Sequence, residues 1–247
     1  MDRVAAALLE VGRRHGLRVC FKASFDKANR ARLEGARGPG MDAGLRALDR
    51  IRSGHGIPVL TDFHEASQAA EVASVVDVLQ IPAFLSRQTD LLVAAGRTGK
   101  PVNVKKGQWM HPDAMRGAVE KIRAGGTTEV AVTERGTFFG YGDLVVDFRS
   151  LRRLGSATGA SVVFDATHSV QQPGQGTGGT SGGLRDCVPD LLAAAAVSGA
   201  DGFFLETHPD PARALSDAAT QWPLDRLDWL VGRTVSLWQQ ARETAHG

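Results

Sequence analysis

The 247-residue sequence lacks the features that mark secreted, membrane-spanning and nucleic-acid-binding proteins. Its two cysteines, Cys20 and Cys187, have no short spacing between them, which argues against a disulfide framework and favours a reducing cytoplasm. Its longest apolar stretches, such as Leu191–Val197, are too short to span a bilayer, and its first residues do not have the pattern of a signal peptide. The formal net charge is only +2 and no dense run of Lys or Arg occurs, so nucleic acid is not an expected partner.

The motifs of several enzyme classes are missing as well. No GxSxG elbow, CxxC pair, HExxH helix or P-loop occurs, so serine hydrolase, zinc protease and nucleotide kinase activities have no support. The glycine-rich segment Gly174–Gly183 has no GxGxxG pattern after a strand, and we expect it to be a mobile loop that closes over a site. Gly136 and Gly140 are expected to let the chain turn tightly after Arg135.

What the sequence does contain is an alternation of short apolar segments with helix-length segments. The predicted strands are Arg18–Lys22, Pro58–Asp62, Val76–Gln80, Pro101–Lys105, Glu129–Thr133, Ser161–Asp165 and Gly202–Glu206. The predicted helices are Asp2–His15, Asp42–Ser53, Glu65–Ser74, Gln88–Arg97, Pro112–Arg123, Arg185–Ser198 and Leu224–Ala245. Short continuous apolar strands between helices indicate a parallel sheet that is covered on both faces.

Seven strands favour a TIM-type (β/α)₈ barrel over an open Rossmann sheet, and the length suits one barrel domain over residues 1–247. Because the sequence begins with a helix, we expect the first of the eight strands to be missing.

A polar or ionisable residue follows each predicted strand. These residues are Lys22, Asp62, Gln80, Lys105, Glu134 with Arg135, Asp165 with His168, and Glu206 with His208. Because the carboxyl ends of barrel strands open on one face, such residues are expected to converge on one active site. Polar residues are common after any strand, so at a single position this explanation is as good as an active site. The whole set of residues favours a pocket.

A group of cations lies in this set and close to it in the sequence. They are Lys22, Lys27, Arg30, Arg87, Lys105, Lys106 and Arg135. Clustered and desolvated cations need anions, and a substrate with phosphates and a carboxylate would supply them, with Arg as a two-pronged donor and Lys as a point charge. The alternative is a solvated rim of ordinary salt bridges, and Asp26 between Lys22 and Arg30 could explain part of the pattern that way.

A smaller group is suited to a metal ion. His168, Glu206 and Asp217 offer one imidazole and two carboxylates, which suit a divalent ion such as Fe²⁺, Mn²⁺, Zn²⁺ or Co²⁺. An ion with an open coordination position would activate water or polarise a carbonyl. From spacing alone, a structural role for these scattered residues is the more common explanation.

Seven segments together strongly resemble the 3-deoxy-D-manno-octulosonate 8-phosphate synthase family, in order and over essentially the whole chain. They are KASFDKANR (Lys22–Arg30), TDFHE (Thr61–Glu65), IPAFLSRQTDLL (Ile81–Leu92), NVKKGQ (Asn103–Gln108), TERGTFFGY (Thr133–Tyr141), DATHSVQ (Asp165–Gln171) and ETHPDPARALSDAATQWPL (Glu206–Leu224). The KANR segment is specific, because the related DAHP synthases and sialic acid synthases carry a different pattern there. The resemblance implies a cytoplasmic enzyme that condenses phosphoenolpyruvate with D-arabinose 5-phosphate and water for lipopolysaccharide synthesis, without an organic cofactor.

The resemblance also implies roles for individual residues. Lys22, Lys27, Lys105 and Arg135 match positions that bind the phosphate and carboxylate of phosphoenolpyruvate, and Asn29 and Arg30 match positions that contact the pentose phosphate. Arg87 matches an arginine that reaches that phosphate from a neighbouring subunit, which implies a homo-oligomer, usually a tetramer. Asp62 and Gln80 match residues that line the pocket. The candidate catalytic residues are Lys105, Asp62 and His168, with Lys105 or a metal-bound hydroxide as the proton shuttle.

The DATHSVQ and ALSDAATQWPL segments resemble the metal-dependent branch of the family, in which His168, Glu206 and Asp217 match three ligands. The family begins with a strand that ends in a GPC-like or GPN-like turn, and its Cys is the fourth ligand in metal-dependent members. We expect that strand and ligand to be missing here, and Cys20 to be a buried core thiol. Ala31 stands where the family usually has a Ser that can contact the pentose phosphate.

Two other functions remain open on the sequence. One is a DAHP-type or sialic-acid-type synthase that uses another aldehyde. The other is an inactive paralogue that binds sugar phosphates, which the missing strand makes plausible because it exposes the edges of its two neighbours.

Overall fold

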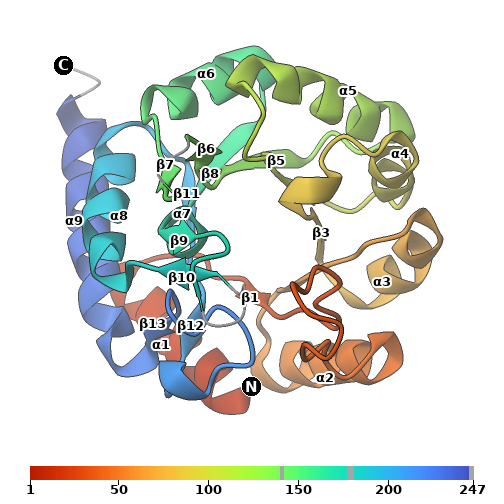
Figure 1. Cartoon of the computed structure of the whole chain (residues 1–247), viewed down its shortest axis with the longest axis horizontal. Helices are drawn as coiled ribbons and strands as arrows, with labels where there is room; N and C mark the ends of the chain where they lie inside the picture. The colour runs from red at the N-terminus through yellow and green to blue at the C-terminus, as the bar shows by residue number, and fades with distance from the viewer. Residues whose placement is uncertain (140–141, 177–180, 245–247) are drawn as a thin grey trace.

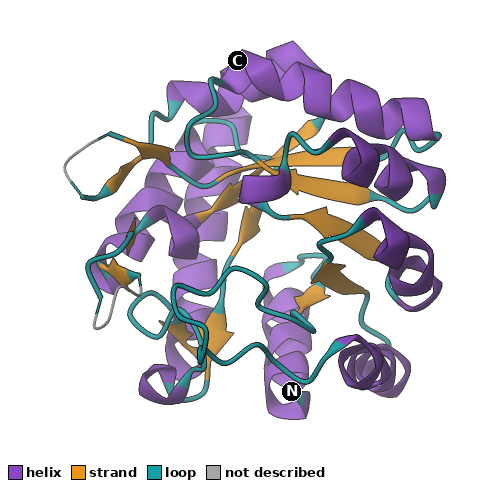
Figure 2. Ribbon diagram, turned by 45° about the vertical axis from the view of Figure 1, so that its right-hand side comes forward, coloured by secondary structure: helices purple, strands orange, loops and turns teal. Residues whose placement is uncertain are grey.

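Seven parallel strands form one curled sheet, and helices cover its outer side (Figure 1, Figure 2). The structure is a computed structural model, and it describes residues 1–139, 142–176 and 181–244. The strand order is β1-β2-β3-β4-β5-β8-β11, so neighbouring strands follow one another along the chain and β1 and β11 form the two edges. The sheet is a curled half-barrel, consistent with an incomplete TIM barrel, and the predicted α/β fold class is confirmed.

The inner strands of this sheet are buried over most of their length, as the continuous apolar segments predicted, whereas the edge strand β11 is only partly buried. They are β1 (Phe21–Lys22), β2 (Val59–Asp62), β3 (Val78–Ile81), β4 (Val102–Lys105), β5 (Val130–Glu134), β8 (Ser161–Asp165) and β11 (Gly202–Phe204). Three short pairs stand outside the sheet, formed by β6 (Thr137–Phe138) with β7 (Leu144–Val145), β9 (Gln171–Gln172) with β10 (Gly182–Gly183), and β12 (Thr207–His208) with β13 (Trp222–Pro223).

The helices surround the sheet in chain order, except for the short α7, which follows directly on β8 inside the helical layer (Figure 1). They are α1 (Asp2–His15), α2 (Met41–His55), α3 (Ala69–Val75), α4 (Thr89–Arg97), α5 (Met115–Gly125), α6 (Arg149–Thr158), α7 (Ala166–Ser169), α8 (Val188–Val197) and α9 (Leu227–Thr244). α1 packs against both α2 and α9, so the first helix joins the two ends of the helical layer (Figure 1). No helix in the described ranges has the length and apolar character needed to cross a bilayer.

Close packing between helices depends on glycines at one contact. A Cβ atom on Gly96 of α4 would lie 1.9 Å from the carbonyl oxygen of Ile122 in α5, and one on Gly125 would lie 2.5 Å from the carbonyl oxygen of Val93. The two helices therefore approach through facing backbones. This contact fixes the wall behind β3, β4 and β5, whose carboxyl ends carry candidate site residues.

The predicted elements differ from the observed ones in a few places. Helix α6 was missing from the prediction, and β1 is reduced from the predicted Arg18–Lys22 to two residues. As an edge strand, β1 has a single neighbouring strand, and only Phe21 and Lys22 pair with β2. The predicted tight turn at Gly136 is confirmed by its φ of 93°, whereas Gly140 lies outside the described residues.

The prediction that Cys20 is a buried core thiol is wrong. Cys20 is exposed, whereas the next residue, Phe21, is buried in the core. Alternation along an extended segment turns Cys20 to the opposite side from Phe21, and β1 is an edge strand. Cys187 is also a free, exposed cysteine, in agreement with the absence of a disulfide framework.

Candidate active site at the strand ends

The carboxyl end of β2 and the segment after β1 form the first part of the charged cluster. Asp62 is the centre of this part, because Ser24 donates a hydrogen bond of 2.6 Å to its Oδ1 and His64 Nε2 lies 3.2 Å from its Oδ2. Lys22 Nζ lies 3.4 Å from Asp62 Oδ1 and donates a hydrogen bond of 2.8 Å to Ser24. Burial alone would raise the pKa of Asp62, but the charge of Lys22 and the contact with His64 hold it well below its ordinary value.

Glu206, which follows β11, joins several of the predicted residues. Its Oε1 lies 3.7 Å from Lys22 Nζ, 3.8 Å from Lys27 Nζ and 3.7 Å from His168 Nε2. Burial opposes ionisation, but the charges of His168, Lys27 and Lys22 outweigh it and lower the pKa of Glu206 to about 2. Lys22 responds in the opposite direction, because the carboxylates of Asp62 and Glu206 raise its pKa in spite of burial.

Asp165, at the end of β8, bridges the candidate proton shuttle and the candidate metal ligand. It is fully buried, and its Oδ2 lies 2.6 Å from Lys105 Nζ and 2.7 Å from His168 Nδ1. Lys105 Nζ also lies 3.8 Å from the centroid of the Phe204 ring, in a cation–π contact. Burial and the charge of Lys22 lower the pKa of Lys105, although Asp165 opposes that change.

Arg135 is connected to the same cluster through one amide. Its Nη2 donates a hydrogen bond of 2.5 Å to Gln171 Oε1, and Gln171 Nε2 donates one of 2.6 Å to Asp217 Oδ1. Arg135 is 5% exposed, and its Nη1 is buried with no hydrogen-bond partner in the described part of the chain. A buried guanidinium with one unused donor group is suited to hold an anion.

Lys106 differs from its neighbour, because it lies in the wall of the barrel. It is fully buried, and its Nζ lies 3.4 Å from Glu134 Oε1 and 3.2 Å from the hydroxyl of Thr137. It also donates to the carbonyl oxygens of Gly107 and Met110. With four oxygens around it, this ammonium group has its hydrogen bonds satisfied by the protein itself, so we assign it a structural role.

The three predicted metal ligands come together. One ligand atom each from His168, Glu206 and Asp217 lies within 4.8 Å of the other two. Two ligands bonded to one ion at about 2.1 Å lie roughly 3–4 Å apart, so these side chains need only small shifts to share an ion. Asp165 Oδ2 lies 2.7 Å from His168 Nδ1, and His168 Nε2 is on the side of Glu206, where it could bind an ion. The donor set therefore fits a divalent cation.

Not every predicted residue reaches this cluster. Gln80 lies inside the barrel, where it accepts a hydrogen bond of 3.2 Å from Asn103. Asn29 and Arg87 are exposed, and Arg30 is half-buried with an unpartnered Nε. In the described ranges no contact joins Asn29, Arg30 or Arg87 to the charged cluster, so their roles remain predictions.

Gln171, His64 and Phe204 were absent from the predicted site residues, whereas Asp165 was among the polar residues expected at the pocket but was given no role. Asp165 and Gln171 bridge predicted residues, His64 contacts Asp62, and Phe204 lies under Lys105. Asp165 carried a signal, because it is the last residue of a buried strand. Nothing in the local sequence indicated that the Gln171 amide would face Arg135, since the two residues are 36 positions apart. The predicted loop Gly174–Gly183 is described only in part, and its central residues 177–180 lie outside the described ranges.

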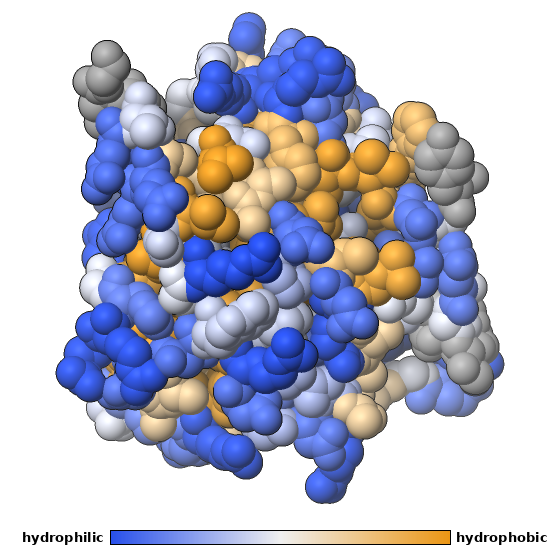
Figure 3. Space-filling model, turned by 90° about the vertical axis from the view of Figure 1, so that its left-hand side faces the viewer, coloured by the Kyte–Doolittle hydropathy of each residue, from blue (hydrophilic) through white to orange (hydrophobic). Residues whose placement is uncertain are grey.

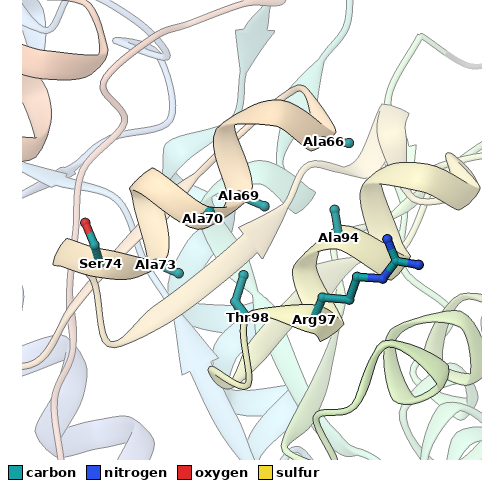
Figure 4. Close-up of a pocket in the computed structure, with 8 residues that line it drawn as sticks. All are labelled: Ala66, Ala69, Ala70, Ala73, Ser74, Ala94, Arg97 and Thr98. Carbon is teal, nitrogen blue, oxygen red and sulfur yellow. The ribbon is translucent and has the colours of Figure 1, made fainter.

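Two surface hollows lie among the helices and contain none of these residues. One of about 460 Å³ separates α3 from α4 and is lined by small side chains together with Arg97 and Thr98 (Figure 4). The other, also of about 460 Å³, includes Val197 of α8 and Leu237 of α9 in its lining. Figure 3 shows the side of the molecule that carries these two helices, where hydrophobic residues gather between hydrophilic ones. The charged cluster at the strand ends therefore lies apart from both hollows.

A model of the DAHP synthetase I family matches residues 1–241. The chain belongs to this family. Among its curated relatives, a 2-dehydro-3-deoxyphosphooctonate aldolase from Nitratidesulfovibrio vulgaris strain DP4 is 56% identical over 95% of this chain and 85% of its own. Proteins of the same name from Nitrobacter winogradskyi and Alkalilimnicola ehrlichii are 55% and 52% identical over 94% of this chain, and over 81% and 83% of their own lengths. Proteins with this name thus match 94–95% of the chain.

Proposed function

We propose that this enzyme condenses phosphoenolpyruvate with D-arabinose 5-phosphate and water to give 3-deoxy-D-manno-octulosonate 8-phosphate and inorganic phosphate. The observation that carries the proposal is that Lys22 and Lys105 lie beside Glu206 and Asp165 at the strand ends, and that Gln171 links Arg135 to Asp217 of the same cluster. The name shared by relatives at 52–56% identity supports the same reaction and the role of such enzymes in lipopolysaccharide synthesis.

Phosphoenolpyruvate carries a phosphate and a carboxylate, and the cluster offers matching cations. In the proposed complex, Arg135 binds one of these groups through its free Nη1, and Lys22, Lys27 and Lys105 neutralise the other. C3 of phosphoenolpyruvate then attacks the aldehyde carbon of the open-chain pentose, water adds at C2, and the adduct expels phosphate. Fixed cations stabilise the charge on the phosphate. Because both substrates are held in a reactive orientation, much of the entropic barrier to the reaction is removed.

Lys105 is the proposed proton shuttle. Its lowered pKa brings the ammonium group nearer to the range in which it can give up a proton, and Asp165 holds it in place. Asp62 fixes Lys22 and contributes negative charge beside the reacting centre. Asn29, Arg30 and Gln80 are proposed to contact the pentose phosphate or line its pocket.

His168, Glu206 and Asp217 are proposed to hold a divalent cation such as Fe²⁺, Mn²⁺, Zn²⁺ or Co²⁺, as in the metal-dependent branch. A cation there would supply electrostatic activation of water or of the aldehyde oxygen. His168 keeps its Nε2 on the side of Glu206 through the contact of Nδ1 with Asp165.

A homo-oligomer, with a tetramer as the expected form, completes the proposal. Phe84 and Trp109 stack with ring centroids 6.0 Å apart, and both are about half exposed. Arg87 follows Phe84 by three residues and makes no ion pair in the part of the chain that the structure describes. Contact with a second copy would cover the aromatic pair and give Arg87 a phosphate in the neighbouring site, as the family resemblance implies.

The test is release of inorganic phosphate from phosphoenolpyruvate with a panel of aldehydes. We expect D-arabinose 5-phosphate to be used at a kcat/KM at least tenfold above that of a four-carbon phosphosugar or an N-acetylated sugar. A preference for either of those aldehydes would favour the DAHP-type or sialic-acid-type alternative. Binding of phosphoenolpyruvate without phosphate release from any pair would favour the inactive paralogue.

A further inference from the structure

Gln171 joins the proposed anion site to the proposed cation site through a single amide. Its Oε1 accepts from Arg135 Nη2, and its Nε2 donates to Asp217 Oδ1 at 2.6 Å. The side chain is buried, at 8% exposure, so water does not compete freely for these bonds. Arg135 faces the proposed anion and Asp217 faces the proposed cation, so the amide lies between two groups that bind opposite charges.

The chemistry of the amide fixes its orientation. A carboxylate only accepts hydrogen bonds and a guanidinium only donates them. The amide oxygen must therefore face Arg135 and the amide nitrogen must face Asp217. A reversed amide would place its N–H groups against the guanidinium and its oxygen against the carboxylate, and would lose both bonds.

Both ends of this bridge are held by the backbone. Gln171 lies in β9 and pairs with Gly183 of β10. Asp217 has a φ of 53°, an unusual value for a residue other than glycine, and its carbonyl oxygen accepts from the amides of Thr220 and Gln221 at 2.9 Å each. The two side chains are thus presented to each other by fixed segments, and a change in the direction of the Asp217 carboxylate must move the amide.

We propose that Gln171 is a positioning residue that couples cation binding at Asp217 to anion binding at Arg135. This inference rests on the proposed function and adds a linkage to it. When Asp217 turns toward a cation, the amide follows its hydrogen bond and sets the angle at which Arg135 presents Nη1. Because such coupling is reciprocal, a bound anion strengthens cation binding by the same factor.

The experiment measures phosphoenolpyruvate binding to the full-length protein by calorimetry, after removal of metal and after loading with Mn²⁺. The coupling factor is the ratio of the two dissociation constants. For the wild type we expect a factor of roughly ten, within the usual range for linked sites. Gln171→Met keeps the length of the side chain but removes both hydrogen bonds. In this variant we expect the coupling factor to fall to about two, which is what direct attraction between the two bound charges would leave.

Gln172 provides the matched control, because it is the next residue of β9 and carries the same amide. Its Nε2 donates a hydrogen bond of 2.6 Å to Asp143, outside the charged cluster. Gln172→Met removes a hydrogen bond of the same kind and should keep the wild-type coupling factor. A second variant, Gln171→Asn, retains the amide but is one methylene too short to reach both partners, and should lose coupling as Gln171→Met does.

The outcomes separate this inference from the proposed function. A wild-type protein that binds neither phosphoenolpyruvate nor Mn²⁺ would contradict the proposed function and this inference together. A wild type that binds both, with the same coupling factor in a folded Gln171 variant, would overturn the inference alone. Loss of coupling in Gln172→Met to the same extent would also overturn it, because the effect would then belong to β9 as a whole.

Discussion

Lys105 and Lys106 are neighbours in the chain, but they belong to two different regions of the molecule. Both are buried, and both lie beside a buried carboxylate. Lys105 faces the interior of the barrel, with Asp165 on one side and the charge of Lys22 nearby. Lys106 faces the wall, where Glu134 and three other oxygens surround it.

The difference shows what marks a binding cation. The ammonium group of Lys106 has an oxygen for each of its protons, so it needs no further hydrogen-bond partner. It links the loop after β4 to the loop after β5. Lys105 meets a second lysine and an aromatic face, and its pKa is lowered by burial and by that repulsion. An anion would relieve the repulsion among the cations of the site, whereas it could do nothing for Lys106. Crowding of like charges, more than burial, thus indicates a ligand-binding role.

The largest expected effect comes from breaking the structural pair. Lys106→Met leaves the buried carboxylate of Glu134 without its cationic partner, with only the backbone amides of Arg135 and Gly136 still donating to it, so we expect the free energy of unfolding to fall by about 3 kcal/mol. Urea unfolding followed by circular dichroism would measure this. The double variant Lys106→Met/Glu134→Gln keeps an oxygen for the amides of Arg135 and Gly136, and should recover more than half of the loss. A single variant as stable as the wild type would contradict the structural role.

Replacing Lys105 by Met should lower activity rather than stability. In Lys105→Met, Asp165 keeps its contact with His168, so we expect the unfolding midpoint to stay close to that of the wild type. Loss of a positioned cation and proton shuttle should lower kcat roughly 10²–10³-fold. Steady-state phosphate release measures this, and near-normal turnover would remove Lys105 from the mechanism.

Acid should destabilise the protein through the carboxylates of the site. The folded-state pKa of Glu206 is lowered from 4.5 to about 2, and that of Asp62 lies well below 3.8. When the pH falls below the ordinary pKa of these carboxyl groups, the unfolded state binds more protons than the folded state. The stability that the two carboxylates contribute is therefore complete above about pH 5 and is lost as the pH falls toward 2. The urea midpoint should drop steeply over that window, and less steeply in Glu206→Gln. A constant midpoint down to pH 2.5 would contradict the charge pairing.

The smallest expected effect concerns the aromatic surface under Lys105. Phe204→Leu keeps an apolar side chain but removes the cation–π contact, which is worth about 0.5–2 kcal/mol. We expect kcat/KM to fall by roughly 3–30-fold with little change in the unfolding midpoint. The matched control is Phe203→Leu on the same strand, because Phe203 packs against Trp238 at the opposite side. Equal losses of activity in both variants would refute a specific role for Phe204.

The sequence predicted the sheet well because buried parallel strands are continuous apolar segments, and all seven predicted strands overlap the observed ones, with their ends within three residues. It missed α6, although RSLRRLGSAT is rich in Arg and Leu, which favour helices, and Leu151 and Leu154 are buried at helical spacing. It placed Lys22, Lys105 and Arg135 on one face because strand ends share a direction. Strand position alone did not separate Lys105 from Lys106, because that depends on which way each side chain turns, and only the family resemblance singled out Lys105.

The remaining gaps have the same cause. The Gln171 bridge depends on a contact between distant segments, and the exposure of Cys20 depends on its place at a sheet edge. Asn29, Arg30 and Arg87 stay predictions because their proposed partners are a substrate and a second copy of the chain. The direction of the strands can be predicted from local sequence, but the distances between side chains at the strand ends cannot.

The most direct measurement is a crystal structure of the protein soaked with phosphoenolpyruvate. The account predicts that one anionic group of the ligand lies within hydrogen-bond distance of Arg135 Nη1 and that the other contacts Lys105 Nζ, both at the carboxyl ends of the strands. A ligand bound elsewhere, with Arg135 and Lys105 still paired only to protein groups, would contradict it.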